Sequence, residues 1–449
     1  MKGNRHFTAQ FTCILFLLGC IMLQGFTKMV NMKPLGGHVK AEKPVELSFK
    51  TYYDGSYQAF LTEHAKRNTG FREFFIRNYN QVLYSCFHKI NNNTLTEGKD
   101  REIFLNMYLE EITGEMIKAR YGTVEEAKRQ AQHNVEETLR LIDTLEQHGT
   151  KFLFVFAPTK TAVYPEKMPQ YYQDRIADFC LEEYYIDLFK ENNIPHIDFY
   201  HYFQDIRDTV SWPLYTRTAS HWAESILPYV ADSLLRKLEA VTGYPMPSVE
   251  LLDLNVTDQY SDYDREFEKS MNMLFPWPKP DVPRPFYTLT PSPSLDGTVK
   301  GGDRPNLLVT GDSYFDQLMF SCFKDAFNHW DFWQYNLNVY SSRGYWKEPF
   351  ENIRDLPVTL SEADILLAIY TAPMLYDFMF DFPNKAFNMY DLTETEIAKV
   401  SEEIRRDKPW FEAVVKQAEN KGITVEENLR INAIYVINAR KDKNKSENP

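Results

Sequence analysis

The chain has 449 residues, 43% of them hydrophobic and 15% aromatic, so it can bury a large core in one large or two ordinary domains. A formal net charge of −13 argues against a nucleic-acid partner, because polyanions bind proteins through basic surfaces. The five cysteines form no CxxC and no cluster with histidine, so the sequence predicts neither a disulfide framework nor a metal site.

Residues 7–27 are apolar or weakly polar, carry no charge and are long enough to cross a bilayer. Positive charge in residues 1–6 predicts a cytoplasmic N-terminus and sends the rest of the chain outward. No small-residue cleavage site follows closely, which favours an uncleaved signal anchor over a removed signal peptide. Leu17 to Cys20 loosely resembles a lipobox, so lipidation is the alternative. Residues 28–50 then form a polar tether.

Strands and helices alternate along the central part of the chain, which predicts an α/β fold with a doubly wound parallel sheet flanked by helices. The expected elements are helices within 51–90 and over 124–149, a strand at 151–158, a helix around 174–192, a strand at 194–199, a helix over about 222–240, a strand and helix within 306–319, an aromatic-rich segment at 330–340 and a strand at 363–373.

The remaining segments are connections or extensions. Residues 276–305 are rich in Pro and Gly and are expected to be a surface connection without a regular element. Residues 393–437 predict two or three amphipathic helices. We therefore expect one main domain over 51–380, a helical C-terminal extension over 381–440 and a disordered tail over 441–449.

The segment NLLVTGDSYFDQLM at 306–319 carries the strongest chemical signal. Its apolar start predicts a buried strand, Gly311 and Asp312 predict a turn, and Ser313 then opens a helix. A serine on such a turn has an exposed Oγ with backbone N–H groups nearby, which can hold an oxyanion. The G-D-S triplet is the form seen in SGNH hydrolases, although an ordinary turn and helix cap would have the same letters.

A serine nucleophile needs a base, and His221 stands out among the ten histidines. It lies in TRTASHW, residues 216–222, before a predicted helix and beside Trp222. The plainer interpretation is a capping or core-edge histidine.

Four segments in this order resemble the alginate O-acetyltransferases of the AlgJ/AlgX type, over about residues 51–380. They are TGFREFFIRNYNQVLY (69–84), FAPTKTAVYPEKMP (156–169), TRTASHW (216–222) and LLVTGDSYFDQL (307–318). The resemblance implies an SGNH-like fold, with Ser313 as nucleophile and His221 as base. It also implies a periplasmic domain anchored in the inner membrane, a polysaccharide substrate, and a membrane-bound O-acyltransferase that delivers acetyl. No cofactor is implied.

The chain departs from that family's D-x-H-W motif, because Ala219 stands where the family has the aspartate that orients the histidine. Loss of this acid typically lowers the catalytic rate of a triad enzyme by several orders of magnitude. Another carboxylate can replace it, and the candidates are Asp198, Asp262 and Asp264. A chance acidic residue is the alternative for each.

Further residues are candidates for substrate contacts. Lys160 and Tyr164 follow a strand end, where a strand-cap role is equally open. Arg343 could pair with a uronate carboxylate or be a solvated arginine. Trp333, Tyr335 and Asn336 could line a sugar groove, with core packing as the alternative for Trp333.

The leading hypothesis is an extracytoplasmic, membrane-anchored O-acetyltransferase that acts on a bacterial surface polysaccharide through acetyl-Ser313. A carbohydrate esterase would use the same residues, because water would then replace the sugar hydroxyl. Ala219 motivates a third hypothesis, a non-catalytic binding or scaffold protein of the export machinery.

Overall fold

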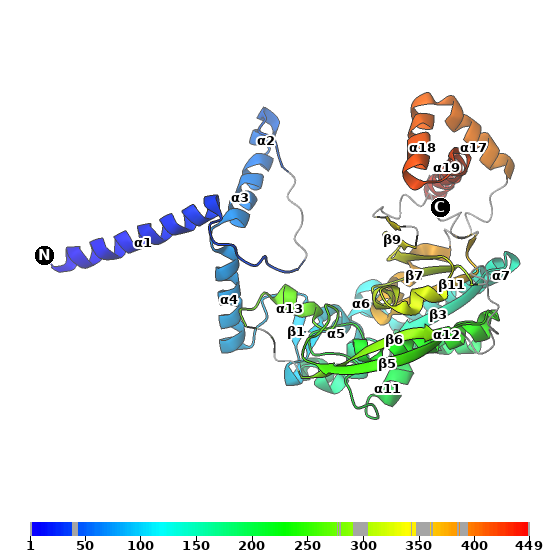
Figure 1. Ribbon diagram of the computed structural model, residues 1–449, viewed down its shortest axis with the longest axis horizontal. Coiled ribbons are helices and arrows are strands. Elements are labelled where there is room, and N and C mark those ends of the chain that lie inside the picture. Colours follow the sequence, from blue (N-terminus) through cyan, green and yellow to red (C-terminus); the bar gives the residue numbers. More distant parts are fainter. Residues whose placement is uncertain are drawn as a thin grey trace.

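The computed structural model describes residues 2–37, 44–275, 277, 280–290, 304–342, 344–346, 360, 362–383, 386 and 394–447. A seven-stranded sheet with the order β10-β9-β8-β7-β11-β3-β4 forms its centre (Figure 1). The strands are β3 (Lys151–Ala157), β4 (His196–Asp198), β7 (Leu307–Gly311), β8 (Trp330–Gln334), β9 (Asn338–Ser341), β10 (Gly344–Trp346) and β11 (Ile365–Thr371). The five strands from β8 to β4 are parallel, and β9 and β10 continue the sheet antiparallel at one edge.

Helices cover both faces of this sheet. In β3, Phe152, Phe154 and Phe156 pack into one core, and the alternate residues Leu153, Val155 and Ala157 pack into the other. Such burial on both faces explains why β3 and β11 read as continuous apolar runs. The first core takes α7 (Val124–Gln147) and α10 (Leu181–Glu191), and the second takes α11 (Phe199–Ile206), α12 (Leu227–Thr242) and α14 (Tyr314–Met319). The predicted α/β fold is confirmed.

Shorter elements surround this frame. They are a hairpin of β1 (Leu95–Glu97) and β2 (Ile103–Leu105), the helices α5 (Asn106–Ile112), α6 (Glu115–Arg120), α8 (Lys160–Val163), α9 (Gln170–Gln173) and α13 (Glu266–Met271), and the 3₁₀ segments η1 (Lys99–Arg101), η2 (Pro165–Lys167), η3 (Glu224–Ile226), η4 (Cys322–Ala326) and η6 (Ala372–Asp381).

One sequence prediction is wrong between residues 276 and 305. Part of this segment is strand β6 (Val282–Thr290), which pairs antiparallel with β5 (Ser248–Thr257). Pro283 and Pro285 led to this error, because proline has no N–H to donate to a strand ladder and its presence normally argues against a strand. A two-stranded ribbon tolerates them, since each strand has a free edge toward which a proline nitrogen can face.

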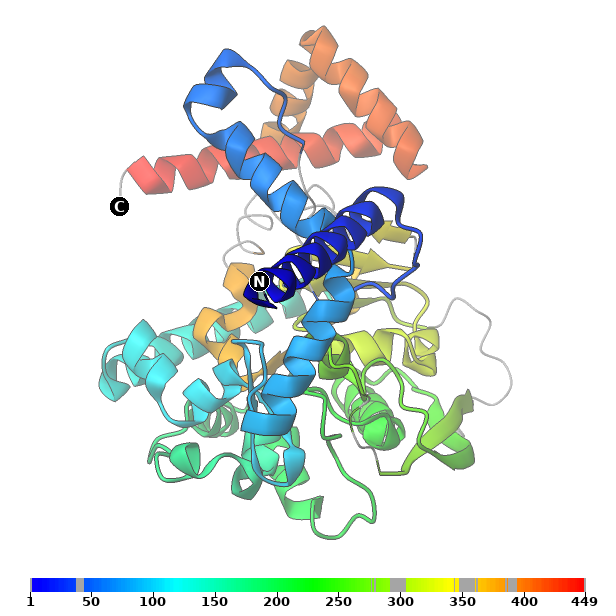
Figure 2. The same ribbon diagram turned by 90° about the vertical axis from the view of Figure 1, so that its left-hand side faces the viewer.

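The N-terminal helices stand apart from the sheet. Helix α1 (Lys2–Thr27) is long, and its Thr8–Thr27 portion has a mean hydropathy of 1.8, which suits a membrane span by length and composition. Helices α2 (Phe49–Tyr53), α3 (Ser56–Asn68) and α4 (Arg72–Phe87) follow the tether, within the predicted helical range 51–90 but for the start of α2. Helix α1 projects from the body beside them (Figures 1 and 2).

Three C-terminal helices, α17 (Glu394–Arg406), α18 (Lys408–Lys421) and α19 (Val425–Glu447), share a small core of their own around Ile404, Val414 and Leu429. They form the predicted helical extension. The expectation of a disordered tail is wrong for residues 441–447, because α19 continues through them. Lysine and glutamate in that stretch are good helix formers.

Candidate active site

Ser313 follows β7 at the carboxyl edge of the parallel sheet. Gly311, the last residue of β7, lies against the neighbouring strand β11, where a Cβ atom would come within 2.6 Å of the carbonyl oxygen of Ile369. Only glycine fits there without displacing backbone, so the turn that begins at Gly311 is set by a steric requirement.

Asp312 fixes the turn that presents Ser313. Its Oδ2 accepts hydrogen bonds from the backbone N–H and the hydroxyl of Thr371, both at 2.8 Å, and its Oδ1 accepts one from the N–H of Tyr314 at 3.0 Å. These bonds tie the start of α14 to the end of β11, at the carboxyl edge of the parallel sheet where ligand sites of such folds lie. Burial raises the pKa of Asp312 despite these bonds.

Ser313 and His221 are in hydrogen-bond contact, with 2.8 Å between Oγ and Nε2. His221 is 8% exposed and its ring lies 5.0 Å from the ring of Tyr314. The hydroxyl of Tyr314 donates to the carbonyl of Ser220 at 2.6 Å, which ties the His221 loop to α14. Ser313 and Asp316 are partly exposed in a segment whose other side chains through Met319 are buried, so the site opens at these two residues.

The carboxylate that contacts His221 is that of Glu266, at the start of α13. Its Oε2 lies 2.9 Å from Nδ1 of His221 and also accepts hydrogen bonds from the hydroxyl and the N–H of Ser220, at 2.8 and 3.1 Å. The segment is held there by backbone, since the N–H of Phe267 donates to the carbonyl of Thr218 at 2.9 Å. Ser313, His221 and Glu266 thus form a serine–histidine–carboxylate chain.

The electrostatics of the contact between His221 and Glu266 favour a charged or strongly hydrogen-bonded pair. Burial works against the imidazolium, but the charge and hydrogen bond of Glu266 outweigh it and raise the pKa of His221. Burial likewise opposes the Glu266 carboxylate, but His221 and Ser220 outweigh it and lower the pKa of Glu266. A carboxylate in this state holds the proton on Nδ1 and leaves Nε2 free to accept one from Ser313.

Tyr335 lies on the other side of Ser313. Its hydroxyl is 3.0 Å from the Ser313 Oγ, to which it donates, and it accepts the Ser313 backbone N–H at 3.3 Å. Tyr335 follows β8, and its N–H donates to the carbonyl of Gly311 at 2.7 Å. Its backbone lies in the left-handed region, with φ of +51°, which costs a bulky residue energy and turns the ring toward Ser313.

Lys160 is buried away from the reacting atoms, contrary to its prediction as a substrate contact. Its Nζ lies 2.8 Å from Glu102 Oε2 and donates to the carbonyls of Thr216, Arg217 and Ile103. A lysine buried on a strand end is satisfied by a carboxylate and carbonyls, which leaves no donor for a sugar. Its bonds hold the segment that leads to His221.

Other predicted substrate contacts are structural. The hydroxyl of Tyr164 accepts the N–H of Leu214 at 2.9 Å, and Trp333 is 1% exposed in the core. Asn336 is also buried, where its amide bonds Thr310 and the carbonyls of Met379 and Phe380. These side chains are buried because of the direction in which they leave the strands and turns, and the sequence alone does not determine that direction. Arg343 lies outside the described residues.

The three aspartates proposed to orient His221 make other contacts. Asp198 caps α11 and bonds His201 and Lys190. Asp262 pairs with Arg265 and Lys269, and Asp264 accepts the N–H of Glu224. Glu266 replaces them as the carboxylate at His221. The sequence pointed to the correct segment, YSDYDREF, but only the pairing of this segment with 216–221 selects Glu266.

Comparison with known proteins finds a family that matches part of the chain. Residues 117–335 match the family described as "SGNH hydrolase-like domain, acetyltransferase AlgX". This segment, just under half of the chain, is similar to that family. The match includes Ser313, His221, Glu266 and Tyr335. No curated protein matches the chain.

Solved structures similar to the chain include two proteins of the same type. The O-acetyltransferase domain of Pseudomonas putida AlgJ is 15% identical with a TM-score of 0.40, over 66% of this chain and 99% of that one. Pseudomonas aeruginosa AlgX is 16% identical with a TM-score of 0.40, over 67% and 71%. Bacillus cereus PatB1 is 13% identical with a TM-score of 0.33, over 57% and 93%. Helices lie on both sides of the segment that matches the family.

Proposed function

We propose that this protein is an extracytoplasmic O-acetyltransferase that modifies a bacterial polysaccharide through an acetyl-Ser313 intermediate. The contact chain from Ser313 through His221 to Glu266, with Tyr335 beside the nucleophile, carries the proposal. Similarity to the AlgX family supports acetyl transfer as the reaction. The name of the alginate-type relatives supports a polysaccharide as the acceptor.

In the first half-reaction, Nε2 of His221 takes the proton of Ser313 as Oγ attacks the acetyl carbonyl of the donor. The bond from the acetyl carbon to the donor's leaving group then breaks, and His221 returns the proton to that group. Glu266 holds the ring with its Nδ1–H fixed and stabilises the imidazolium while it exists.

The negative charge that develops on the acetyl oxygen needs donors placed beforehand. The Ser313 N–H donates to the Tyr335 hydroxyl, which in turn donates to Oγ, and the acyl oxygen would replace the tyrosine oxygen and Oγ as the acceptor of these two donors. Removing a single donor of this kind typically lowers kcat by 10²- to 10³-fold, which corresponds to about 3–4 kcal/mol of transition-state stabilisation.

In the second half-reaction a sugar hydroxyl gives its proton to His221 and attacks the acetyl carbon, and Ser313 Oγ leaves with a proton. The partly exposed carboxylate of Asp316 lies at the opening and accepts a hydrogen bond from Gln334 at 2.8 Å, so it is placed to bind an acceptor hydroxyl. The non-catalytic hypothesis is motivated by the missing acid at Ala219, and the contact of Glu266 with His221 argues against it.

The location is part of the proposal. The apolar helix α1 would anchor the chain in the inner membrane, with the domain on the periplasmic side, where no acyl-coenzyme supply exists. A membrane-bound O-acyltransferase would then deliver the acetyl group to Ser313, as the family resemblance implies.

The test is acetylation of the detergent-solubilised full chain by 4-nitrophenyl acetate, read by intact mass. We expect one acetyl adduct on wild type and none on Ser313→Ala or His221→Ala. A wild type that takes up no more acetyl than Ser313→Ala contradicts the proposal. Adding a mannuronate oligomer separates transfer from hydrolysis, since acetylated sugar indicates a transferase and free acetate alone indicates an esterase.

A further inference from the structure

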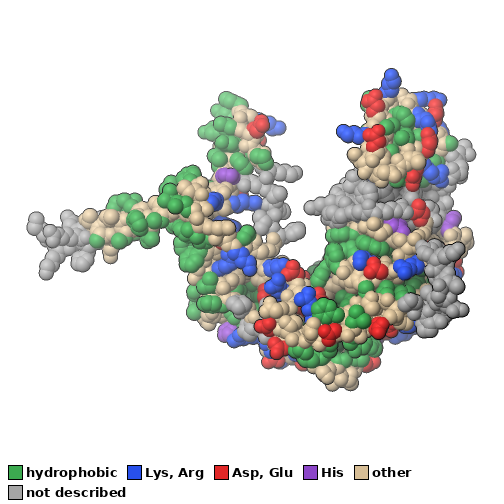
Figure 3. All heavy atoms as spheres, viewed as in Figure 1, with side chains coloured by type: hydrophobic (Ala, Val, Ile, Leu, Met, Phe, Trp, Pro, Cys, Tyr) green, Lys and Arg blue, Asp and Glu red, His purple; other side chains and the backbone are tan. Residues whose placement is uncertain are grey.

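Helix α4 has an apolar face that the protein itself leaves uncovered. Phe75, Tyr79 and Val82 recur at helical spacing and are each exposed by half or more. Cys86 continues the same face and is also exposed. This periodicity predicted a helix, and such a face normally packs on a core. Here hydrophobic side chains gather over α1, α3 and α4 on the side from which α1 projects (Figure 3).

The orientation of α4 is fixed by its opposite face. The amide of Asn80 donates to the carbonyl of Met271 at 2.9 Å, and the ring of Tyr84 packs against Trp277 with centroids 4.8 Å apart. The guanidinium of Arg77 donates to the carbonyls of Lys33 and Pro34 in the tether, at 2.8 and 2.7 Å. Turning α4 to bury its aromatic face would break all of these contacts.

The anchor helix meets α4 at its N-terminal end. Gly70, just before α4, lies so close to α1 that a Cβ atom would come within 1.9 Å of the carbonyl oxygen of Ile21, and Gly25 of α1 approaches Asn68 in the same way. From this junction α1 runs away from the body, whereas α4 runs crosswise to it over the face of the molecule (Figures 1 and 2). A membrane crossed by α1 would therefore lie along α4.

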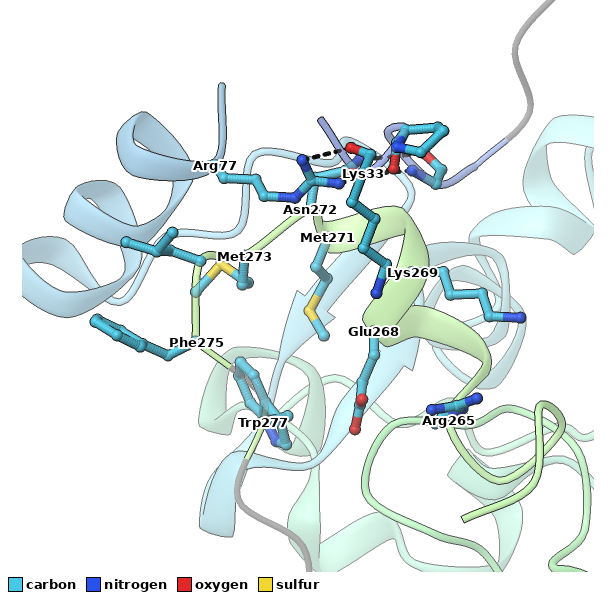
Figure 4. Close-up of a pocket in the computed structure, with 13 residues that line it drawn as sticks. Lys33, Arg77, Arg265, Glu268, Lys269, Met271, Asn272, Met273, Phe275 and Trp277 are labelled. Carbon is cyan, nitrogen blue, oxygen red and sulfur yellow. Dashed lines mark hydrogen bonds between the residues drawn. The ribbon is translucent and has the colours of Figure 1, made fainter. Parts of the chain in front are cut away.

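A basic pocket of about 420 Å³ lies beside the packed face of α4 (Figure 4). Lys33, Arg77, Arg265 and Lys269 line it with one carboxylate, Glu268. Asp262 pairs with two of these cations, Arg265 and Lys269, and leaves the pocket with more positive than negative charge. Much of its remaining wall is apolar, formed by Met271, Met273, Leu274, Phe275 and Trp277, with Asn272 as a polar neighbour.

We propose that α4 lies on the surface of the membrane that α1 enters, and that the pocket binds the headgroup of an anionic phospholipid. Apolar side chains on one face of a helix beside an anchor suit the headgroup boundary of a bilayer. Cations in a pocket with an apolar wall suit a phosphate joined to acyl chains, and anionic lipids attract such basic sites. Leu274 and Phe275, both exposed, extend the apolar wall toward the lipid.

The inference rests on the proposed anchor, so the experiment tests the two separately. The full chain, with Cys86 as its sole cysteine and bimane attached there, is reconstituted into vesicles of phosphatidylcholine or of an equal mixture with phosphatidylglycerol. Flotation tests the anchor. Quenching of bimane by lipids with a nitroxide near the headgroup tests whether α4 is docked. Cys86 lies about 21 Å along α4 from its first turn, so insertion of α1 alone does not place the label in the lipid.

Matched variants separate the two surfaces. Phe75→Ser with Tyr79→Ser removes aromatic rings from the proposed membrane face, and Phe87→Ser removes an exposed ring of the same helix outside that face. Lys33→Gln with Lys269→Gln removes pocket charge, and Lys416→Gln removes an exposed charge from α18. Circular dichroism melting of each variant in the same vesicles verifies that it folds.

We expect bimane quenching in both lipids, stronger with phosphatidylglycerol. The Phe75/Tyr79 variant should lose most of the quenching in both lipids. The Lys33/Lys269 variant should lose only the additional quenching seen with phosphatidylglycerol. Both control variants should match the parent protein. A floating protein whose label is not quenched overturns the docking of α4. Equal quenching in the two lipids overturns the headgroup site. A protein that does not float removes the anchor and this inference with it.

Discussion

Glu266 Oε2 lies 2.9 Å from Nδ1 of His221, although the two residues come from different segments of the chain. The carboxylate arrives from α13, and Ser220 binds the same oxygen with its hydroxyl and its N–H. The carboxylate that orients the ring of His221 therefore comes from a neighbouring segment, and within the loop itself only the Ser220 hydroxyl, at 3.4 Å, approaches Nδ1. Glu266 thus both orients the ring and holds the His221 loop through Ser220.

Replacing Glu266 by Gln should lower the rate of Ser313 acetylation by about 10³- to 10⁴-fold, because an amide no longer fixes the tautomer or stabilises the imidazolium. Burst kinetics with 4-nitrophenyl acetate measure this rate. Glu268→Gln makes the same change two residues along α13, outside the contact with His221, and should leave the rate near wild type. Equal effects of the two substitutions would show that Glu266 does not orient the base.

The acetylation rate should fall at low pH through a pKa above the usual value for histidine. His221 must be neutral to accept the Ser313 proton, and Glu266 raises its pKa against the effect of burial. Burial raises the pKa of Asp316 to about 7, and its ionised form favours the imidazolium, so Asp316→Asn should move the falling limb slightly to lower pH. A pH profile of the acetylation rate checks the direction, and a shift to higher pH would contradict it.

Much of the frame could be predicted from the sequence, because buried parallel strands and the glycine-bounded turn at Ser313 leave local patterns. The serine and histidine carry such patterns too. Glu266 could not be found this way, since its contact depends on the pairing of 264–267 with 216–221. The β5–β6 ribbon was missed for the related reason that its prolines are tolerated only at a strand edge that the sequence does not reveal.

Tyr335→Phe should lower the acetylation rate by about 10²- to 10³-fold without changing stability, because it removes one donor from the oxyanion position and leaves the ring in place. Tyr263→Phe is the matched control, since that ring lies edge-on to His221 with centroids 6.3 Å apart and has no hydrogen bond to Ser313 among the described contacts. Single-turnover rates and melting temperatures should be measured together. If Tyr335→Phe acetylates at the wild-type rate, the second donor must be sought elsewhere.

Lys160→Met should destabilise the domain by about 3 kcal/mol or more, because it leaves the buried carboxylate of Glu102 with a single lysine partner, Lys167. Denaturant unfolding of the solubilised chain measures the change. The double variant Lys160→Met with Glu102→Gln should recover part of it, since the buried carboxylate that lost one of its two lysine partners is then gone. A substrate-binding lysine predicts the reverse pattern, in which KM for the acceptor rises and the free energy of unfolding is unchanged. The carbonyls of Thr216 and Arg217 lose their donor in both variants, so the single and double variants should share a reduced acetylation rate through a loosened His221 loop.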